Sequence, residues 1–246
     1  MANDTQIKEN ISSDISPAII NEMIKRGVYI GKMKSKSHPK MKNFIFGTRH
    51  NLQIINLEKT IAKLNESLEY IKTIAKNKGT ILFVATKMPA KLLIKEAAIK
   101  CDMPYVEERW LGGTLTNINT ILKRIEYFLD LEKRKNSGDL TKYTKKEQLQ
   151  FEKELAELFH NFNGIKNLKK LPDAIFVVDA AAHKWTINEA IKTKVPIIAI
   201  VNTDSDPTRV TYPIPANSES IESIKFILEK ITEAVTQEKV AEAITQ

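Results

Sequence analysis

Apolar residues along this chain follow two spacings, one typical of buried strands and the other of helices. Continuous apolar runs of strand length lie at 80–85, 174–178 and 196–201. Such runs are typical of a parallel sheet, because its strands are buried on both faces. Stretches with apolar residues at helical spacing separate the runs. Strands that alternate with helices predict the α/β class, with a Rossmann-like doubly wound parallel sheet and right-handed crossovers.

The same pattern, together with the prolines and glycines that begin or end helices and strands, predicts the other elements. Ser16 and Pro17 form a helix start, and Gly27 and Gly79 each end a helix. Gly47 lies between two short stretches with strand character. We expect helices over 17–27, 57–79, 89–101, 186–194 and about 221–235, and short strands over 44–46, 52–55 and 104–106.

Two long amphipathic helices, expected over 116–135 and 144–162, interrupt the alternation. A polar loop joins them, and Thr144 with Glu147 makes a capping box at the start of the second helix. We expect an inserted antiparallel helical coiled-coil hairpin whose apolar stripes pack mainly on each other. The expected domains are a flexible tail over 1–16, an α/β domain over 17–115 and 164–237, the hairpin over 116–163, and a tail over 238–246.

Composition excludes several classes of protein. The chain has 246 residues, 42% of them hydrophobic and 28% charged, which excludes wholesale disorder. Its one cysteine, Cys101, excludes an internal disulfide framework and a four-cysteine zinc module. No apolar run approaches the roughly 18 residues that a membrane span needs, and the N-terminal region carries acidic residues instead of an apolar block. We expect a soluble, cytoplasmic protein of a reducing compartment.

Positive charge is concentrated in one segment. The chain carries 38 basic and 30 acidic residues, a net charge of +8, yet no Asp or Glu occurs from Met23 to Leu57. A charge run is ordinarily a solvated surface, but a long acid-free run repels itself unless a polyanion binds it. The chain offers no short helix for reading duplex DNA, so we expect structured RNA as the partner, without DNA or membrane. The candidate phosphate contacts are Lys32, Lys34, Lys36, His38, Lys40, Lys42 and Arg49, together with Lys123, Arg124, Lys133 and Arg134 on the hairpin.

Two enzyme hypotheses can be tested on the same pattern. A dinucleotide site needs glycines in the first strand-to-helix turn, but the turn at 86–89 reads Thr-Lys-Met-Pro. Asp179, Asp204 and Asp206 follow predicted strands, at the edge where such folds bind ligands, and could hold Mg²⁺. The sequence Asp-Ser-Asp-Pro also explains the last two as a simple turn. We therefore expect no metal and no cofactor, and an α/β enzyme that uses Mg²⁺ at these carboxylates is the alternative.

Five strings resemble one known family. They are HPKMKNFIFGTRHNLQIINLEKT from His38, ILFVATK from Ile81, RWLGGTLTN from Arg109, LKKLPDAIFVVDA from Leu168 and PIIAIVNTDSDP from Pro196. In their order and spacing they resemble small-subunit ribosomal protein two, in its bacterial and organellar form, over about 17–236. Several long strings in register are a far more specific signal than any single motif.

The resemblance implies a Rossmann-like domain with an inserted coiled-coil hairpin, and a structural, rRNA-binding role in the small ribosomal subunit without catalysis. It further implies a place near the mRNA exit side, contact with neighbouring small-subunit proteins, and a part in anchoring small-subunit protein one where that protein exists. The source is then a bacterium or an organelle. The positions that match the family motifs are Lys40, Lys42, Arg49, Lys87, Arg109, Trp110 and Asn117. From their charge and their place in loops we expect Lys87, Arg109, Trp110 and Asn117 to bind RNA as well.

The first motif departs from the family. Tyr29 and Lys32 stand where histidines are common, and Lys36-Ser37-His38 replaces an Arg-Trp-Asn stretch. The resemblance therefore transfers no metal or stacking role to these positions, whereas their positive charge still favours phosphate. Ala85 replaces a usual glycine, and Ala181-Ala182 replaces a polar pair after Asp179, which weakens the argument for a metal there.

Overall fold

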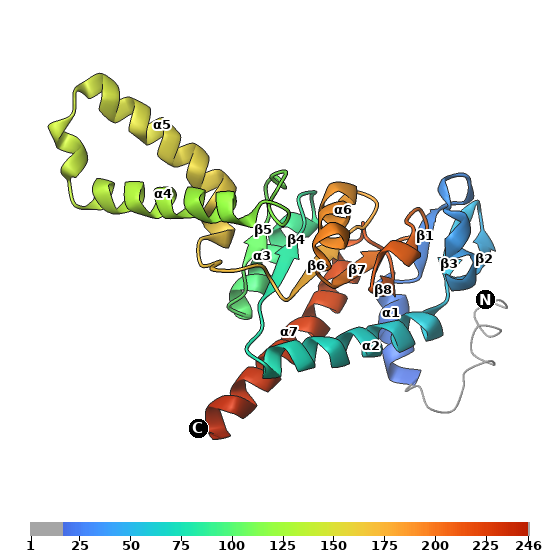
Figure 1. Cartoon of the computed structure of the whole chain (residues 1–246). Helices are drawn as coiled ribbons and strands as arrows, with labels where there is room; N and C mark the ends of the chain where they lie inside the picture. Colours follow the sequence, from blue (N-terminus) through green and yellow to red (C-terminus); the bar gives the residue numbers. More distant parts are fainter. Residues whose placement is uncertain (1–16, 246) are drawn as a thin grey trace.

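The computed structural model describes residues 17–245, and the tail expected over 1–16 lies outside them (Figure 1). Five parallel strands form the central sheet, and each of the three predicted apolar runs supplies one of them. The strand order is β5-β4-β6-β7-β8, so the order reverses between β4 and β6. Ligands of doubly wound folds bind where the order reverses, beyond the carboxyl ends of the strands. The strands are β4 (Ile81–Val84), β5 (Tyr105–Val106), β6 (Ala174–Val178), β7 (Ile197–Val201) and β8 (Tyr212–Pro215).

Helices cover both faces of this sheet and create two hydrophobic cores, which confirms the α/β class. One core lies between the sheet and four helices, α1 (Pro17–Lys25), α2 (Leu57–Lys76), α3 (Ala90–Lys100) and α7 (Ile221–Thr245). The other core lies between the sheet and α6 (Lys184–Thr193), and extends into the two long helices of the insertion. Alternate residues of each strand enter the two cores: Phe83 enters the first, while Leu82 and Val84 enter the second.

The strand β8 was missed by the sequence analysis, because its sequence Tyr-Pro-Ile-Pro contains two prolines. Proline lacks the N–H that a central strand needs, so it is tolerated only where one side of the strand is unpaired. The structure satisfies this condition, since β8 is an edge strand that pairs only with β7. The last helix also differs from expectation, because α7 continues to Thr245 through residues that were placed in a C-terminal tail.

A second, three-stranded antiparallel sheet lies within the acid-free stretch from Met23 to Leu57, which we call the basic segment. It contains β1 (Ile30–Met33), β2 (Ile45–Arg49) and β3 (Leu52–Ile55) in the order β1-β3-β2. The sequence analysis missed β1, because its residues lie in a segment that is dominated by lysines. The turn between β2 and β3 is His50-Asn51, both with φ in the left-handed region (48° and 64°), as a type I′ hairpin requires. Gly47, expected between two strands, instead lies inside β2 beside a bulge.

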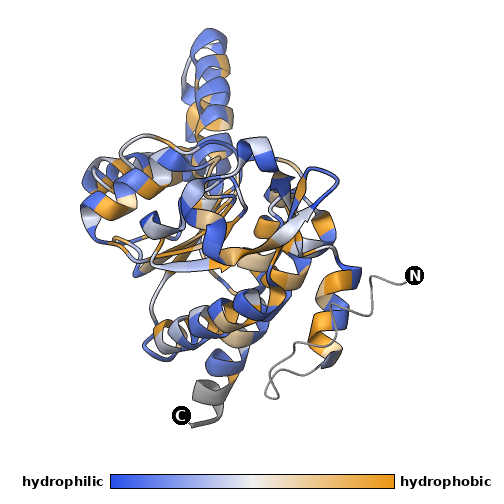
Figure 2. Ribbon diagram, turned by 90° about the vertical axis from the view of Figure 1, so that its right-hand side faces the viewer, coloured by the Kyte–Doolittle hydropathy of each residue, from blue (hydrophilic) through white to orange (hydrophobic). Residues whose placement is uncertain are grey.

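The helices of the insertion, α4 (Ile118–Asn136) and α5 (Lys145–Phe162), pack against each other and project from the body as an arm (Figure 1). The capping box of Thr144 and Glu147 is present at the start of α5. Ile121 and Phe128 of α4 and Leu158 of α5 are buried in the same cluster as Leu82 of the sheet. The inner half of the arm is thus continuous with the core beneath the sheet, and its stripes do not pack on each other alone. Seen from the side of the small sheet, the arm stands above the body and hydrophilic residues cover much of it (Figure 2).

Candidate nucleic-acid interface

The basic segment is attached to the carboxyl end of β7. The backbone N–H of Lys32 donates to Thr203 Oγ1 at 2.8 Å, and the backbone N–H of His38 donates to the Thr203 carbonyl at 2.8 Å. Gly31 lies against the same residue, and a Cβ built there would come within 2.6 Å of Thr203 Cγ2. The segment therefore lies across the edge of the sheet where the strand ends gather polar side chains.

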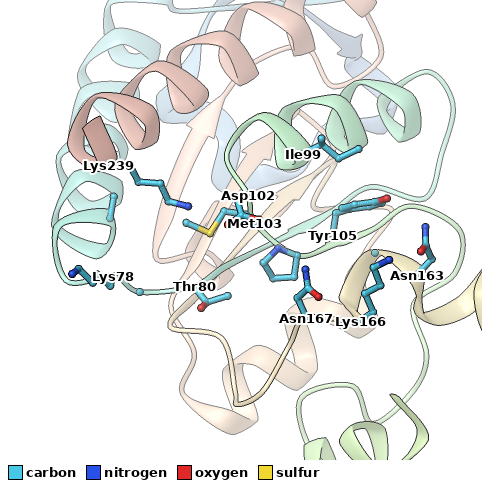
Figure 3. Close-up of a pocket in the computed structure, with 14 residues that line it drawn as sticks. Lys78, Thr80, Ile99, Asp102, Met103, Tyr105, Asn163, Lys166, Asn167 and Lys239 are labelled. Atoms are coloured by element: carbon cyan, nitrogen blue, oxygen red, sulfur yellow. The ribbon is translucent and has the colours of Figure 1, made fainter. Parts of the chain in front are cut away.

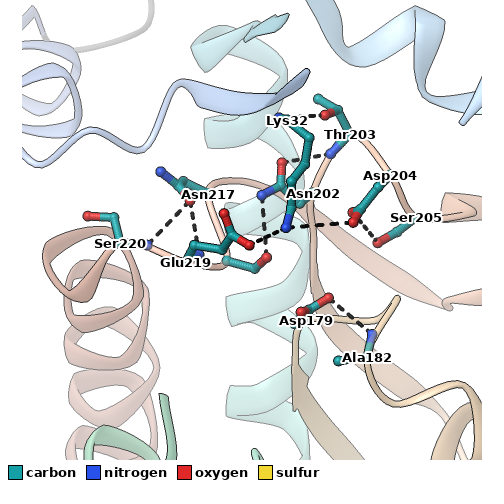
Figure 4. A network of polar contacts seen from close by, with 11 residues as sticks. Lys32, Asp179, Ala182, Asn202, Thr203, Asp204, Ser205, Asn217, Glu219 and Ser220 are labelled. Carbon is teal, nitrogen blue, oxygen red and sulfur yellow. Dashed lines mark hydrogen bonds and ion pairs between the residues drawn. The ribbon is translucent and has the colours of Figure 1, made fainter. Parts of the chain in front are cut away.

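Lys32, a predicted phosphate contact, is paired with acidic residues of its own chain. Its ammonium bonds the Glu219 carboxylate and lies 3.8 Å from Asp204 Oδ2 (Figure 4). Burial by itself would lower the pKa of Lys32, but the hydrogen bond to Glu219 and the charge of Asp204 outweigh it and raise that pKa. Its charge is compensated within the fold, so Lys32 is a poor candidate for an external phosphate.

Lys40 forms a second link of the same kind. Its Nζ donates to Asp206 Oδ2 at 2.8 Å and to Thr208 Oγ1 at 2.8 Å. Burial opposes the ionisation of Asp206, but the hydrogen bonds from Lys40 and Thr208 outweigh burial and lower the pKa of Asp206 to about 2. Asp206 also accepts the Thr208 N–H at 3.0 Å, which makes the Asp-Pro turn that the sequence suggested.

The third carboxylate of the metal hypothesis, Asp179, ends β6 with a left-handed φ of 66°. It accepts the Ala182 N–H at 3.2 Å. Burial, and next the charge of Asp204, raise the pKa of Asp179, while the Ala182 hydrogen bond opposes the rise. Within residues 17–245, no three His, Cys, Asp or Glu side chains are grouped closely enough to hold a metal ion. Asp179, Asp204 and Asp206 are therefore not grouped as the three-carboxylate set of the enzyme alternative.

His183 joins the ends of β4 and β6 beside this carboxylate. Its Nε2 accepts the Thr86 N–H at 3.2 Å, so Nδ1 carries the proton that it shares with the Asp179 carbonyl at 3.0 Å. Burial of the ring lowers the pKa of His183 and outweighs the opposing contacts with Asp179. Both nitrogens are thus used to hold the strand ends together. Lys87, one residue after Thr86, is exposed at the same edge and borders a small hollow with Asp179 and Glu219.

The cations that remain available lie on the outside of the basic segment. Lys34, Lys36, Lys42 and Arg49 are exposed, and their side chains make no ion pair or hydrogen bond with other described residues. His38 is partly exposed, and its Nδ1 accepts the Lys40 N–H at 3.3 Å. The seven candidates in the segment therefore divide into two anchored lysines, one locally bonded histidine and four free cations.

The string RWLGGTLTN forms the loop that leads into α4, and Glu189 of α6 organises it. One carboxylate oxygen accepts Trp110 Nε1 at 3.0 Å and the Gly113 N–H at 2.9 Å, and the other accepts the Leu115 N–H at 3.0 Å. Burial would raise the pKa of Glu189, but these hydrogen bonds outweigh it and lower that pKa. The indole N–H of Trp110 is therefore used inside the chain. The sequence analysis missed Glu189, because an acidic residue within an amphipathic helix gives no signal by itself.

Other candidates lie on exposed positions toward and along the arm. Arg109 and Asn117 are exposed at the two ends of the RWLGGTLTN loop. On α4, Lys123, Arg124 and Lys133 are exposed, and Arg134 is exposed and paired with Asp130 at 2.7 Å. The arm and the small sheet of the basic segment lie on opposite sides of the body, so their cations form two separate surfaces (Figure 1).

A hollow of about 640 Å³ lies at the opposite edge of the parallel sheet, before β4 and β5 (Figure 3). Lys78, Lys166 and Lys239 border it, with Asp102 as its one carboxylate. Lys239 Nζ donates to the Cys101 carbonyl at 2.7 Å. No sequence motif indicated these residues.

Comparison with known proteins gives one consistent result. The family model described as Ribosomal protein S2 matches residues 23–238. The chain is 42% identical over 221 residues to small ribosomal subunit protein uS2 of Dictyoglomus thermophilum, with 90% of each chain covered. It is 43% identical over 218 residues to the protein of that name from Pseudoalteromonas atlantica, with 89% of this chain and 90% of the relative covered. None of the described helices is long and apolar enough to span a membrane.

These matches run through the small sheet, the parallel sheet and the arm alike, so they concern the whole described architecture. The chain belongs to the ribosomal protein S2 family, and it is a structural, non-enzymatic protein of the small ribosomal subunit that functions in translation.

Proposed function

We propose that the chain binds the backbone of small-subunit rRNA through two basic surfaces, the outside of the basic segment and the outside of the arm. The observation that carries the proposal is the group of four exposed cations, Lys34, Lys36, Lys42 and Arg49, which have no partner among the described residues. They lie in a segment without any acidic residue. A phosphate backbone relieves the repulsion among them, and bound counterions are released to solvent.

The arm supports a second contact. Lys123, Arg124 and Lys133 are exposed on a helix whose inner half is fixed to the core through Ile121 and Phe128. Cations held on a rigid projection are suited to structured RNA, which is recognised by shape and backbone. The exposed Lys87, Arg109 and Asn117 lie at the sheet edge and at the arm's entry, and we assign them supporting contacts.

The proposal also includes position in the subunit. Family membership supports a place on the mRNA exit side, among neighbouring small-subunit proteins, and a part in docking small-subunit protein one where that protein exists. Subunits that lack this chain should then lose protein one during a moderate salt wash, while subunits with the chain retain it. Retention of protein one in both would remove that part of the proposal.

The central experiment compares two sets of four substitutions. The test variant changes Lys34, Lys36, Lys42 and Arg49 to Gln and leaves Lys40 in place, because Lys40 holds Asp206. We expect the affinity for purified small-subunit rRNA to fall, and the slope of log affinity against log salt to become shallower by about 0.7 to 0.9 for each phosphate that is no longer neutralised. The charge-matched control changes four exposed lysines at the opposite edge of the sheet: Lys76, Lys78, Lys100 and Lys169. Equal effects of the two variants would contradict the proposed surface.

A further inference from the structure

The outer face of the small sheet is apolar at its centre, and no other part of residues 17–245 buries it fully. Pairing places Met33 of β1, Leu52 of β3 and Arg49 of β2 in one row across the three strands. Neighbours in a strand point to opposite faces, so Gln53 and Ile55, which are buried, define the inner face. On the outer face the exposed fraction is 55% for Met33 and 39% for Leu52.

Phe46 of β2 is the most exposed apolar side chain of the small sheet. It lies at the bulge between Ile45 and Gly47, where it has no partner across the strands, and 62% of it is exposed. Gly47 pairs with Ile54, and a Cβ built on Gly47 would have no atom within 4 Å. The backbone next to Phe46 is therefore open on the side where a side chain of residue 47 would stand.

The charges around this face select its occupant. Arg49 shares the row of Met33 and Leu52, and Lys34 follows Met33 directly, with its N–H donating to the Asn51 carbonyl of the β2–β3 turn at 2.8 Å. Lys34 and Arg49 are exposed and have no side-chain partner among the described residues. A partner that complements both features is anionic and also offers apolar surface. Unpaired nucleotides meet both conditions, because each has a phosphate and a base with a π-face.

We propose that this face, formed by Met33, Leu52 and Arg49, together with the exposed Phe46 on the same strand as Arg49, binds unpaired nucleotides of the rRNA, with a base stacked on the Phe46 ring and the flanking phosphates at Arg49 and Lys34. The inference rests on the proposed function and adds to it the kind of RNA that the small sheet recognises. Single-stranded RNA is recognised in this way, by stacking on exposed aromatic side chains beside a positively charged surface.

The test measures the affinity of the full-length chain for purified small-subunit rRNA at several salt concentrations. Phe46→Ala should weaken binding by about 5- to 150-fold, the range that removal of one stacked aromatic gives, and should leave the salt slope unchanged. Phe46→Tyr should bind like the original chain, while Phe46→Leu should bind like Phe46→Ala, because it keeps apolar area but has no ring. Ile99→Ala is the matched control, since Ile99 is 60% exposed on α3, far from the basic segment.

A second readout locates the contact. Nucleotides whose 2′-hydroxyls become protected from acylation by the original chain, and exposed again with Phe46→Ala, should be unpaired in the free rRNA. Full affinity of Phe46→Ala, or of Phe46→Leu, would overturn the stacking inference. If Phe46→Ala had no effect but the four-cation variant still gave a shallower salt slope, the stacking inference would fail and the proposed rRNA backbone binding would stand. If the salt slope of the four-cation variant were also unchanged, both proposals would fail.

Discussion

Lys40 and Asp206 are 166 positions apart in the chain, and their Nζ and Oδ2 atoms are 2.8 Å apart in the fold. The sequence placed them in rival hypotheses, one as a phosphate contact and the other as a metal ligand. In the structure each is the partner of the other, and the pair joins the basic segment to the loop after β7. The carboxylates at the sheet edge therefore position the cations, and the outermost lysines remain free for an external anion.

The Lys40–Asp206 pair should contribute to stability in a pH-dependent way. The pKa of Asp206 is lowered to about 2 in the fold, against roughly 3.9 in an unfolded chain. The stabilisation is therefore fully present above the unfolded value and is lost as the pH falls through about 2. Asp206→Asn should lower the free energy of unfolding by about 1 kcal/mol at pH 7, a modest value because Lys40 is half exposed to solvent.

Urea denaturation of the original chain and of Asp206→Asn between pH 7 and pH 3 measures the difference in their free energies of unfolding. This difference should become smaller as the pH is lowered. Asp139→Asn is the control, because Asp139 pairs with Lys142 on the exposed tip of the arm and its loss should have little effect on the free energy of unfolding. A constant difference across the pH range would contradict the assignment of the pKa shift to this pair.

Gly31 allows the basic segment to approach β7. Gly31→Ala places a methyl group 2.6 Å from Thr203 Cγ2 and 2.9 Å from the Gln53 carbonyl, so the segment must shift. We expect a loss of about 1–3 kcal/mol in the free energy of unfolding, as for other overpacked sites. Gly47→Ala is the matched control in the same small sheet, because its new methyl group meets open space. Equal thermal midpoints for the two variants would show that the contact with Thr203 is not tight.

His183 predicts a second pH dependence. Its pKa is lowered by burial, so the folded chain holds it neutral while the unfolded chain takes up a proton below roughly pH 6.5. Stability is therefore highest above that pH and falls as the pH is lowered toward the folded pKa. His183→Gln should be less stable at pH 7 and should show a flatter decline between pH 6.5 and pH 5. Thr86→Val should retain the decline, because it keeps the backbone N–H that bonds Nε2.

Glu189→Gln should destabilise the entry to the arm. In glutamine an NH₂ group, which donates, replaces one carboxylate oxygen, which accepts. In one orientation of the amide this NH₂ faces the N–H groups of Trp110 and Gly113, and in the other it faces those of Leu115 and Thr116. An unsatisfied buried group costs about 1–3 kcal/mol, and we expect a loss in this range. The fluorescence of Trp110, measured in a Trp185→Phe background, should report a changed environment. An unchanged emission spectrum and melting temperature would contradict the role given to Glu189.

We propose that the outer part of the arm is dispensable for folding and that its inner part is not. Replacing 134–150 with a Gly/Ser linker removes no residue of the buried α4 stripe, which ends at Leu131. That variant should keep a cooperative melt, and it should keep the rRNA contacts of Lys123, Arg124 and Lys133, which it retains. Replacing 119–161 removes Ile121, Phe128 and Leu158 from the core that they share with Leu82, and should lower the melting temperature markedly. If the variant with the larger deletion melted at the same temperature as the full-length chain, the whole hairpin would be a separate folding unit.

The sequence was informative where a single local pattern decides the structure. The apolar run at 174–178 became β6 with the same limits, and Thr144 with Glu147 capped α5 as expected. The elements that it failed to reveal depend on distant partners. β8 is a strand only because β7 lies on one side of it, and β1 is a strand because β3 pairs with it across a lysine-rich stretch.

The candidate site shows the same division. Charge counting along 23–57 identified the basic segment but could not separate anchored from free lysines, since that depends on Glu219, Asp204 and Asp206 from the far end of the chain. Trp110 was marked as an RNA-binding residue on motif grounds, although its indole N–H is bound by Glu189. The residue type alone does not reveal whether a side chain bonds within its own chain or with a partner, and the structure is needed to distinguish the two.

The carboxylate of Glu189 has a mechanical consequence. It lies on α6, which packs on the parallel sheet, and it binds the amides immediately before α4 begins. The entry of the arm is thus tied to α6 by several hydrogen bonds to one carboxylate, and through α6 to the parallel sheet. The direction in which the arm leaves the body is therefore set by the core of the α/β domain and not by the loop alone.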